Sequence, residues 1–215
     1  MSPTSLSPTS LRQLTRFLVT PLAVLGVLAV PTTAHAETET FHRFEANAVA
    51  IYRAGTLPCD DGTTASLGFR VTGGHEEESE NGVVTENHDF LTVFVSGIDC
   101  GGVFVSDTGT TEDVDFVWSP SLQTASVSGT VTTRRSGHLI AADLSWEATS
   151  PLEVDTNTNT FPGSVNHFVG RARDAIATGT VAFNGRQFVN GSTTEAIIET
   201  LEDTNLDVPV PPGTE

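Results

Sequence analysis

Apolar and hydroxyl-bearing side chains alternate residue by residue in two segments of this chain. Residues 125–131 read Ala-Ser-Val-Ser-Gly-Thr-Val, and residues 175–181 repeat the pattern as Ala-Ile-Ala-Thr-Gly-Thr-Val. Side chains with a period of two lie on opposite faces of a β-strand, so that one row can face a core and the other can face water. The alternation indicates strands with one buried face and is not the pattern of an amphipathic helix.

The same period runs through most of the chain. We expect a hairpin at 123–133 and 138–147, joined by a linker of turn composition, and a two-residue turn at Asn184-Gly185. Further short strands are expected at residues 41–53, 64–72, 89–96, 101–106, 113–118 and 186–189. The sequence therefore predicts an all-β fold, a single β-sandwich or barrel-like domain of about nine or ten antiparallel strands.

Several segments carry more specific expectations. The glycines and acidic residues of 73–82 indicate a connection, and the Asn/Thr-rich segment 151–163 indicates an irregular loop. Residues 89–96 have apolar side chains at both odd and even positions, which predicts a strand covered on both faces. Residues 165–183 are too long for one flat strand, and we expect a bend at Arg171, Arg173 and Asp174. Residues 193–202 fit a strand or a helix, and the all-β context favours a strand.

The N-terminal segment predicts export. Arg12 and Arg16 form a positive region, residues 17–30 form a short apolar run, and Ala-His-Ala ends at Ala36. This is the layout of a secretory signal peptide covering residues 1–36, with cleavage after Ala36. The apolar run is shorter than the ~20 residues that span a bilayer, which disfavours a permanent anchor. The expected location is secreted, either extracellular or at the cell envelope.

After the signal, we expect one domain over residues 37–207 and a flexible Pro-rich tail over 208–215. The chain has no lysine, and its net charge is −17. Such a negative field repels nucleic acid and anionic lipid, so we expect neither as a partner; the expected partner is an extracellular molecule of unidentified kind. The short signal and the acidic, arginine-only composition are typical of a bacterial protein.

Two cysteines, Cys59 and Cys100, lie in the expected domain. In an exported chain they are expected to pair as a disulfide, since neither is surrounded by a catalytic thiol motif.

Metal ligands give a weak signal. No two histidines have the local spacing of a zinc site, so no metal residue is assigned. Calcium is a weak possibility, because Asp155, Asn157 and Asn159 begin like an EF-type loop, although Thr160 replaces the required glycine and Asn166 the required glutamate. Looser oxygen clusters at 76–80 or Asp60-Asp61 are the other calcium candidates, and no cofactor is expected otherwise.

Catalytic motifs are absent from the sequence, and no catalytic residue is assigned. Trp146 lies on the same face of its expected strand as the apolar residues and is expected in the core. The pattern around Trp118 does not assign it to the core or to the surface. The favoured hypothesis is a secreted or cell-surface binding or structural module without enzymatic activity. The alternatives are a carboxylate-using enzyme acting on polysaccharide, or a protease inhibitor with 55–62 as its reactive loop.

Overall fold

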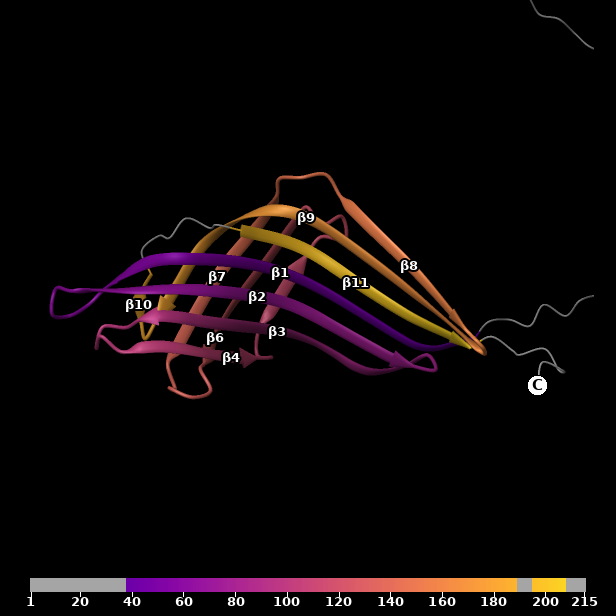
Figure 1. The fold of residues 1–215 in the computed structure, drawn as a ribbon, viewed down its shortest axis with the longest axis horizontal. Coiled ribbons are helices and arrows are strands. Elements are labelled where there is room, and N and C mark those ends of the chain that lie inside the picture. Colours follow the sequence, from indigo (N-terminus) through magenta and orange to yellow (C-terminus); the bar gives the residue numbers. More distant parts are fainter. Residues whose placement is uncertain (1–37, 189–194, 208–215) are drawn as a thin grey trace, which may run out of the picture. The chain divides into compact units, whose positions relative to one another are not determined.

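The chain folds into one antiparallel sheet that doubles back over itself. The computed structural model describes residues 38–188 and 195–207, and these form eleven strands and no helix (Figure 1). The strands are β1 (Thr38–Pro58), β2 (Thr64–Glu80), β3 (Val83–Ile98), β4 (Phe104–Thr111), β5 (Asp115–Trp118), β6 (Thr124–Thr132), β7 (Leu139–Ala148), β8 (Glu153–Phe161), β9 (Ser164–Phe183), β10 (Arg186–Gln187) and β11 (Glu195–Asp207). The described part of the chain therefore offers no apolar helix long enough to cross a membrane. The expected signal peptide, its cleavage after Ala36 and the expected tail at 208–215 lie outside the described residues.

Strand order makes this an open sheet. The order is β4-β3-β2-β1-β11-β9-β7-β6-β5, with β8 and β10 each paired to β9. The two ends of this path, β4 and β5, do not pair with each other, so the sheet is not closed into a barrel. The all-β prediction is confirmed, and the arrangement is that of a sandwich whose two layers belong to one continuous sheet.

Strand β9 carries the chain from one layer to the other. Its first half pairs with β11 up to Asp174, and its second half pairs with β7 from Ala175 onward. This change of partner falls at the end of the segment 171–174, where the sequence indicated a bend or bulge, and the register shows no bulge there. The two alternating segments of the sequence fall on β6 and β9, which flank β7 on either side. In the β9 copy, Gly179 has φ of +127°, and a Cβ there would lie 2.1 Å from the Asp143 carbonyl oxygen, so no larger residue fits.

The core lies between β5–β7 and the parts of the long strands that include 46–57 of β1, 65–71 of β2 and 91–95 of β3. Trp146 is 1% exposed, and its Nε1 donates a 2.9 Å hydrogen bond across the layers to the Val49 carbonyl. The layers approach so closely at Gly73 that a Cβ would lie 2.8 Å from the Cβ of Val127. The prediction that Trp146 belongs to the core is confirmed.

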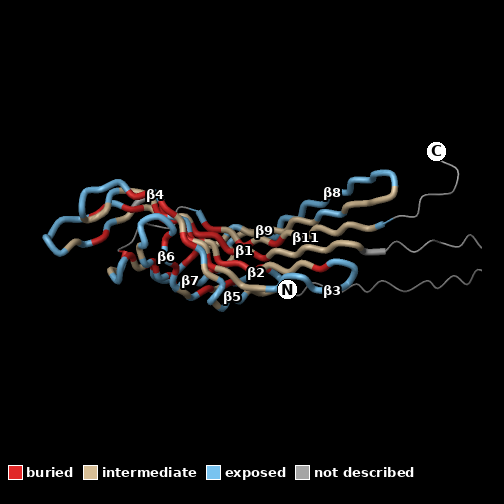
Figure 2. The backbone as a smooth tube through the Cα atoms, turned by 90° about the horizontal axis from the view of Figure 1, so that it is seen from below, coloured by how far each residue is buried: buried red, intermediate tan, exposed pale blue. Residues whose placement is uncertain are grey.

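Beyond this core, the long strands continue as a single layer. Figure 2 shows burial concentrated where β5, β6 and β7 lie against the long strands, and mostly intermediate or exposed residues further along β1, β2, β3, β8, β9 and β11. Strand β8 is exposed at every residue. Among the described residues, no second layer covers this part.

Three local expectations were wrong, and two have the same physical cause. Residues 73–80 belong to β2 and only Asn81-Gly82 form a turn, while 153–161 form β8 instead of an irregular loop. Gly73 and His75 contact the other layer at Val127 and Trp118. The rest of both segments is mostly polar on both faces, which a strand tolerates where no second layer packs on it. The segment 89–96 is covered on one face only, because Phe94 is 42% exposed while Leu91 is fully buried.

The turn predictions were more accurate. Asn184 and Gly185 have φ of 50° and 78° and form the expected two-residue turn. The linker 134–137 joins the expected hairpin of β6 and β7. The ambiguous segment is a strand, since β11 spans Glu195–Asp207; residues 193 and 194 lie outside the described part.

The expected disulfide is present. Cys59 and Cys100 are bonded, with their Cα atoms 5.6 Å apart, and they join the β1–β2 turn to the β3–β4 turn. Beside it, the side chain of Asp60 pairs with Arg186 after β9, so this end of the sandwich is held together in two places.

Candidate binding face

Cross-strand register brings acidic residues together on one face of the single-layer part. Directly paired residues of antiparallel strands project to the same face, so each row of pairs across six strands lies on one surface. Three such rows run from β8 through β9, β11, β1 and β2 to β3. The rows are Glu153-Ala172-Glu199-Asn47-Gly74-Phe90, Asp155-Gly170-Leu201-Glu45-Glu76-His88 and Asn157-Phe168-Asp203-Arg43-Glu78-Glu86. They hold eight carboxylates, and we call this surface, opposite the core side, the carboxylate face.

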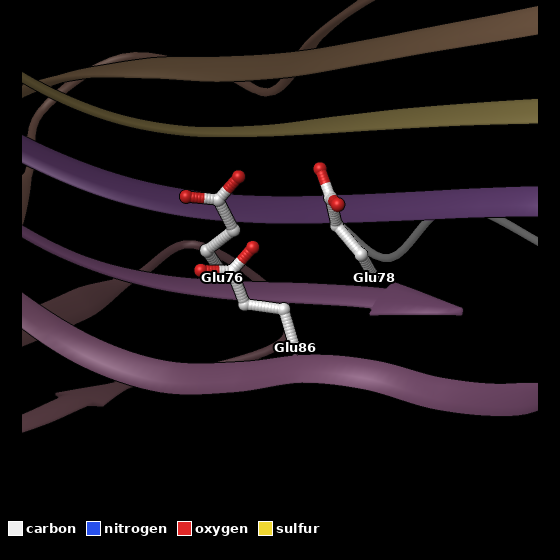
Figure 3. A group of neighbouring side chains, drawn as sticks. All are labelled: Glu76, Glu78 and Glu86. Carbon is white, nitrogen blue, oxygen red and sulfur yellow. The ribbon is translucent and has the colours of Figure 1, made fainter. Parts of the chain in front are cut away.

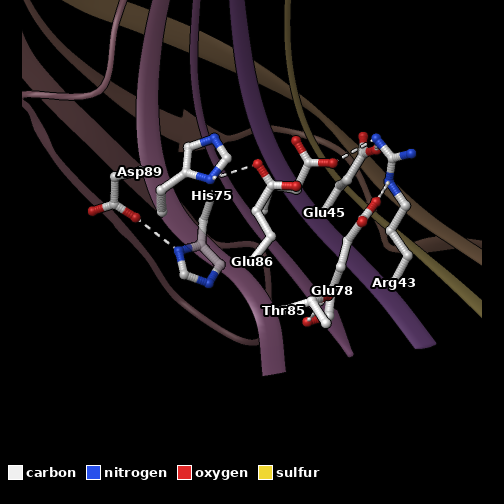
Figure 4. Close-up of polar contacts among 9 residues, drawn as sticks. Arg43, Glu45, His75, Glu78, Thr85, Glu86 and Asp89 are labelled. Carbon is white, nitrogen blue, oxygen red and sulfur yellow. Dashed lines mark hydrogen bonds and ion pairs between the residues drawn. The ribbon is translucent and has the colours of Figure 1, made fainter. Parts of the chain in front are cut away.

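Arg43 is the internal counter-ion of the carboxylate face. Its Nη2 lies 2.5 Å from Glu45 Oε1 and 2.6 Å from Glu76 Oε1, and its Nε lies 3.4 Å from Glu78 Oε1 (Figure 4). Partial burial alone would lower the pKa of Arg43, but the charges of Glu45, Glu76 and Glu78 outweigh it and raise that pKa. One guanidinium therefore neutralises only part of the charge around it.

Three of these carboxylates come close enough to share a cation. Ligand oxygens of Glu76, Glu78 and Glu86 all lie within 4.8 Å of one another, as Figure 3 shows from the side of β2 and β3. Carboxylate oxygens are the ligands that Ca²⁺ takes, and it needs six to eight oxygens in all. Since Arg43 already contacts Glu76 and Glu78, an added cation would have to compete with it.

A shallow groove lies beside Arg43 on the same face. Two hollows of about 330 Å³ and 190 Å³ share Phe168 and Leu201 in their linings. Three carboxylates, Glu153, Asp155 and Glu199, and one cation, Arg171, line one hollow. Glu45, Asp203 and Arg43 itself line the other. The groove therefore has an apolar floor and mainly acidic walls.

Glu199 is a carboxyl group of this groove whose pKa is raised. Burial raises its pKa, the charge of Arg70 acts against that rise, and the charge of Glu45 adds to it. A carboxyl group half removed from water among other acids holds its proton to higher pH than an exposed glutamate does.

A larger hollow lies on the outer side of the other layer. It has a volume of about 650 Å³ and is lined by β5, β6, β7 and β9. Hydroxyl groups of Ser126, Ser145 and Thr178 form one cross-strand row there. Glu147 is its charged side chain, and Val117 and Ile176 are exposed at its rim. This hollow holds the polar row of the alternating segments, and it contains no cationic group.

The calcium candidates fall in different places. Asp155, Asn157 and Asn159 occupy alternate positions along the extended β8, so their side chains are spread along a strand and not gathered around one point. Asp60 pairs with Arg186, and Asp61 accepts hydrogen bonds from Thr63. Of the region 76–80, Glu76 and Glu78 lie on the carboxylate face, whereas Glu77 pairs with Phe44 on the other face.

The remaining sequence candidates are dispersed. His75 lies 2.8 Å from Asp89 (Figure 4). Its ring is tilted against Trp118 with centroids 4.9 Å apart, and it pairs with the buried Ala46, so His75 lies on the core side. Of the segment 55–62, residues 55–58 belong to β1 and pair with β2, so only the residues from Cys59 onward form a turn.

Most residues of the carboxylate face were not predicted from the sequence as parts of a site. Arg43, Glu45, Glu199 and Asp203 were not singled out from the sequence. A usable signal was present, since acidic residues recur two apart at 76 and 78 and at 153 and 155, and Glu199 and Asp203 each lie two residues from Leu201. What the sequence could not supply was the register that aligns these strands.

Comparisons with known proteins identify no family. No family model matches this chain, and no curated protein matches it. Among solved structures, it is similar to a crystal structure from Nitrosomonas europaea described as a "putative AttH", with 11% identity and a TM-score of 0.35. That similarity covers 80% of this chain and 53% of the other, so the chain spans about half the length of that protein. At this level of similarity nothing about activity follows.

Proposed function

We propose that this protein is an exported, non-enzymatic binding module whose carboxylate face takes a cationic, partly apolar ligand, such as an Arg- or Lys-rich peptide segment. The observation that carries the proposal is the alignment of eight carboxylates in three cross-strand rows on an uncovered face. The disulfide is compatible with an oxidising, extracellular location.

Charge and shape both support a cationic ligand. Arg43 shows how a guanidinium fits this surface, because it contacts carboxylates on β1 and β2 at once. Further guanidinium or ammonium groups can pair with the acids that Arg43 does not reach, such as Asp155 and Glu153 on the far strand. Phe168 and Leu201 supply an apolar floor for the methylene stems of those side chains.

The test is binding of a fluorescent peptide of alternating Arg and Leu, followed by anisotropy over a salt series. We expect binding at low salt that weakens as salt rises, since surface charges are screened. The triple variant Glu76→Gln, Glu78→Gln, Glu86→Gln should weaken binding by about tenfold or more, at about 0.5 kcal/mol for each exposed pair.

A matched control removes the same charge elsewhere. Glu112, Asp113 and Asp115 are exposed and lie outside the three rows. Their neutralisation should leave binding within about twofold. Equal losses in both triple variants would mean that net charge alone attracts the peptide and that the carboxylate face is not a site. The same peptide assay with Ca²⁺ added tests whether a divalent cation competes for Glu76, Glu78 and Glu86.

A second candidate function is hydrolysis of polysaccharide by carboxylates, and one observation favours it. Glu199, whose pKa burial raises, is suited to a general acid, and it shares its hollow with Glu153. Both residues pair with Ala172 between them, which sets their strands about 10 Å apart and near the separation of inverting glycosidases. Release of reducing sugar from a polysaccharide panel, abolished by Glu199→Gln, would support it; no turnover on the panel would remove it.

A further inference from the structure

The free edge of β8 differs from the other edges of the sheet. At β4, the Thr108 carbonyl accepts a 2.8 Å hydrogen bond from the Arg134 amide, and the buried Asp107 carboxylate accepts amides of the same loop. At β5, the Phe116 amide donates to Asp89 at 3.0 Å. These contacts cap the two ends of the strand path.

The outer half of β3 is protected in another way. It extends beyond β4 and lies next to a register shift between Glu78 and Ser79 of β2. An irregularity of this kind discourages a further strand from pairing. Strand β8 has a regular register with β9 throughout, and within the described residues nothing contacts the backbone of its outer edge.

The turn after β8 shows which backbone groups face that edge. Phe161 and Ser164 pair across the two-residue turn Pro162-Gly163, so they form the hydrogen-bonded pair next to the turn. Hydrogen-bonded pairs then alternate along the ladder, and the residues between them turn their N–H and C=O groups outward. The outward-facing residues of β8 are Val154, Thr156, Thr158 and Thr160.

These four residues suit strand addition. All are β-branched, the class with the highest strand propensity. The strand contains no Lys or Pro and no bulge, and its two charged residues, Glu153 and Asp155, lie in the half of the strand away from the turn. Nine exposed residues in regular register are thus a template for another strand.

We propose that two copies of this chain associate by antiparallel pairing of their β8 strands, with Asn157 opposite Asn157. This register uses all nine residues and places Thr156 opposite Thr158 and Val154 opposite Thr160, which gives about eight interchain hydrogen bonds. A second copy is favoured over an unrelated strand because this register pairs every outward-facing residue of β8 with another and opposes no two carboxylates. Asp155 then faces Asn159, and Glu153 faces Phe161.

Electrostatics sets a condition on this association. Each copy carries a net charge of −17, so the two repel each other at low ionic strength. Added salt screens that repulsion while leaving backbone hydrogen bonds in place, and the dimer should therefore tighten as salt rises. This response is opposite in sign to that of the cationic ligand above.

Sedimentation of the mature protein over a range of concentration and salt tests the proposal. Thr158→Pro removes an outward N–H without touching a bond to β9, and it should raise the dimer dissociation constant by about tenfold or more, since one bond is lost from each copy. Thr158→Val keeps the N–H and should leave the constant within about twofold. Unchanged circular dichroism of both variants confirms that β8 is still formed.

Cysteine cross-linking tests the register. Asn157→Cys places two thiols on directly opposed residues, within reach of a disulfide, and should give a covalent dimer on oxidation. Val154→Cys places its thiols at opposite ends of the paired strands and should not. A wild-type protein that stays monomeric at all salt concentrations, or equal cross-linking of the two variants, would overturn the proposal.

Discussion

Replacing Arg43 by Gln should have opposite effects on stability and on cation binding. The substitution removes the guanidinium that contacts Glu45, Glu76 and Glu78 at 2.5, 2.6 and 3.4 Å. The Arg43 side chain is 42% exposed, so each contact is discounted from its Coulomb value to the few tenths of a kcal/mol of solvent-exposed pairs. Three such contacts, together with the repulsion among the carboxylates left behind, give a loss of about 1–2 kcal/mol at neutral pH and low salt.

Urea unfolding followed by far-UV circular dichroism measures this loss. Raising the salt or protonating the carboxylates should narrow the difference between Arg43→Gln and wild type, because both weaken the uncompensated repulsion. The matched control is Arg53→Gln, since Arg53 is 72% exposed and has one 3.9 Å contact, to Glu195. That variant should stay within about 0.5 kcal/mol of wild type.

The binding measurement has the opposite sign. With Arg43 gone, an external cation no longer competes with it, so Arg43→Gln should bind the Arg/Leu peptide or Ca²⁺ more tightly than wild type does. Two results would refute the reasoning: an Arg43→Gln protein as stable as Arg53→Gln, or a stability difference that does not respond to salt. Either would mean that Arg43 does not hold the carboxylates together.

Three further substitutions or treatments have defined outcomes. Burial alone would raise the pKa of Asp107, but hydrogen bonds from the Ser136 side chain and from neighbouring amides outweigh it and hold that pKa well below its usual range. The ionised Asp107 therefore stabilises the fold above the unfolded pKa near 4, and this stabilisation is lost as the pH falls further. The free energy of unfolding of Asp107→Asn should consequently depend less on pH below about pH 4 than that of wild type. The raised pKa of Glu199 has the opposite effect on stability, because the ionised carboxylate is less favourable in the folded protein than in the unfolded chain and stability is lost as the pH rises above about 4. Glu199→Gln removes this ionisation and should raise the melting temperature at neutral pH. Reducing the Cys59–Cys100 disulfide, which closes a separation of 41 residues, should remove up to about 4 kcal/mol of unfolding free energy, measured by urea titration with and without reductant.

The sequence predicted best where one face of a strand is buried. Alternation placed Trp146 in the core and identified the hairpin of β6 and β7, because a second layer there requires apolar side chains at every other position. Alternation did not identify residues 73–80 and 153–161 as strands, because neither segment has a continuous apolar face. Their hydrogen bonds to neighbouring strands hold them extended, and the composition of such segments is the same as that of loops.

The candidate site was harder to predict from the sequence, because it depends on pairing between segments that are far apart in the chain. Glu45 and Leu201 are 156 positions apart in the numbering and lie side by side only through the register of β1 with β11. A shift of that register by one residue would move Arg43 and Glu45 to the core side and bring Phe44 and Ala46 to the outside. Burial of Ala46 and Ile198 fixes the register, so the core of the sandwich determines where the acidic rows lie.

Pairing of two copies through β8 would also extend the carboxylate face. The row that contains Arg43 ends at Asn157, which in the proposed register lies opposite the Asn157 of the second copy. The acidic rows of both copies would then lie on one sheet, on either side of a central strip in which each β8 presents Glu153, Asp155, Asn157 and Asn159. A cationic ligand long enough to cross that strip would contact acids of both copies and offset their mutual repulsion. Such a ligand should therefore shift the monomer–dimer equilibrium toward the dimer at low salt, where the protein alone is expected to be monomeric. A short cationic peptide confined to one copy should not.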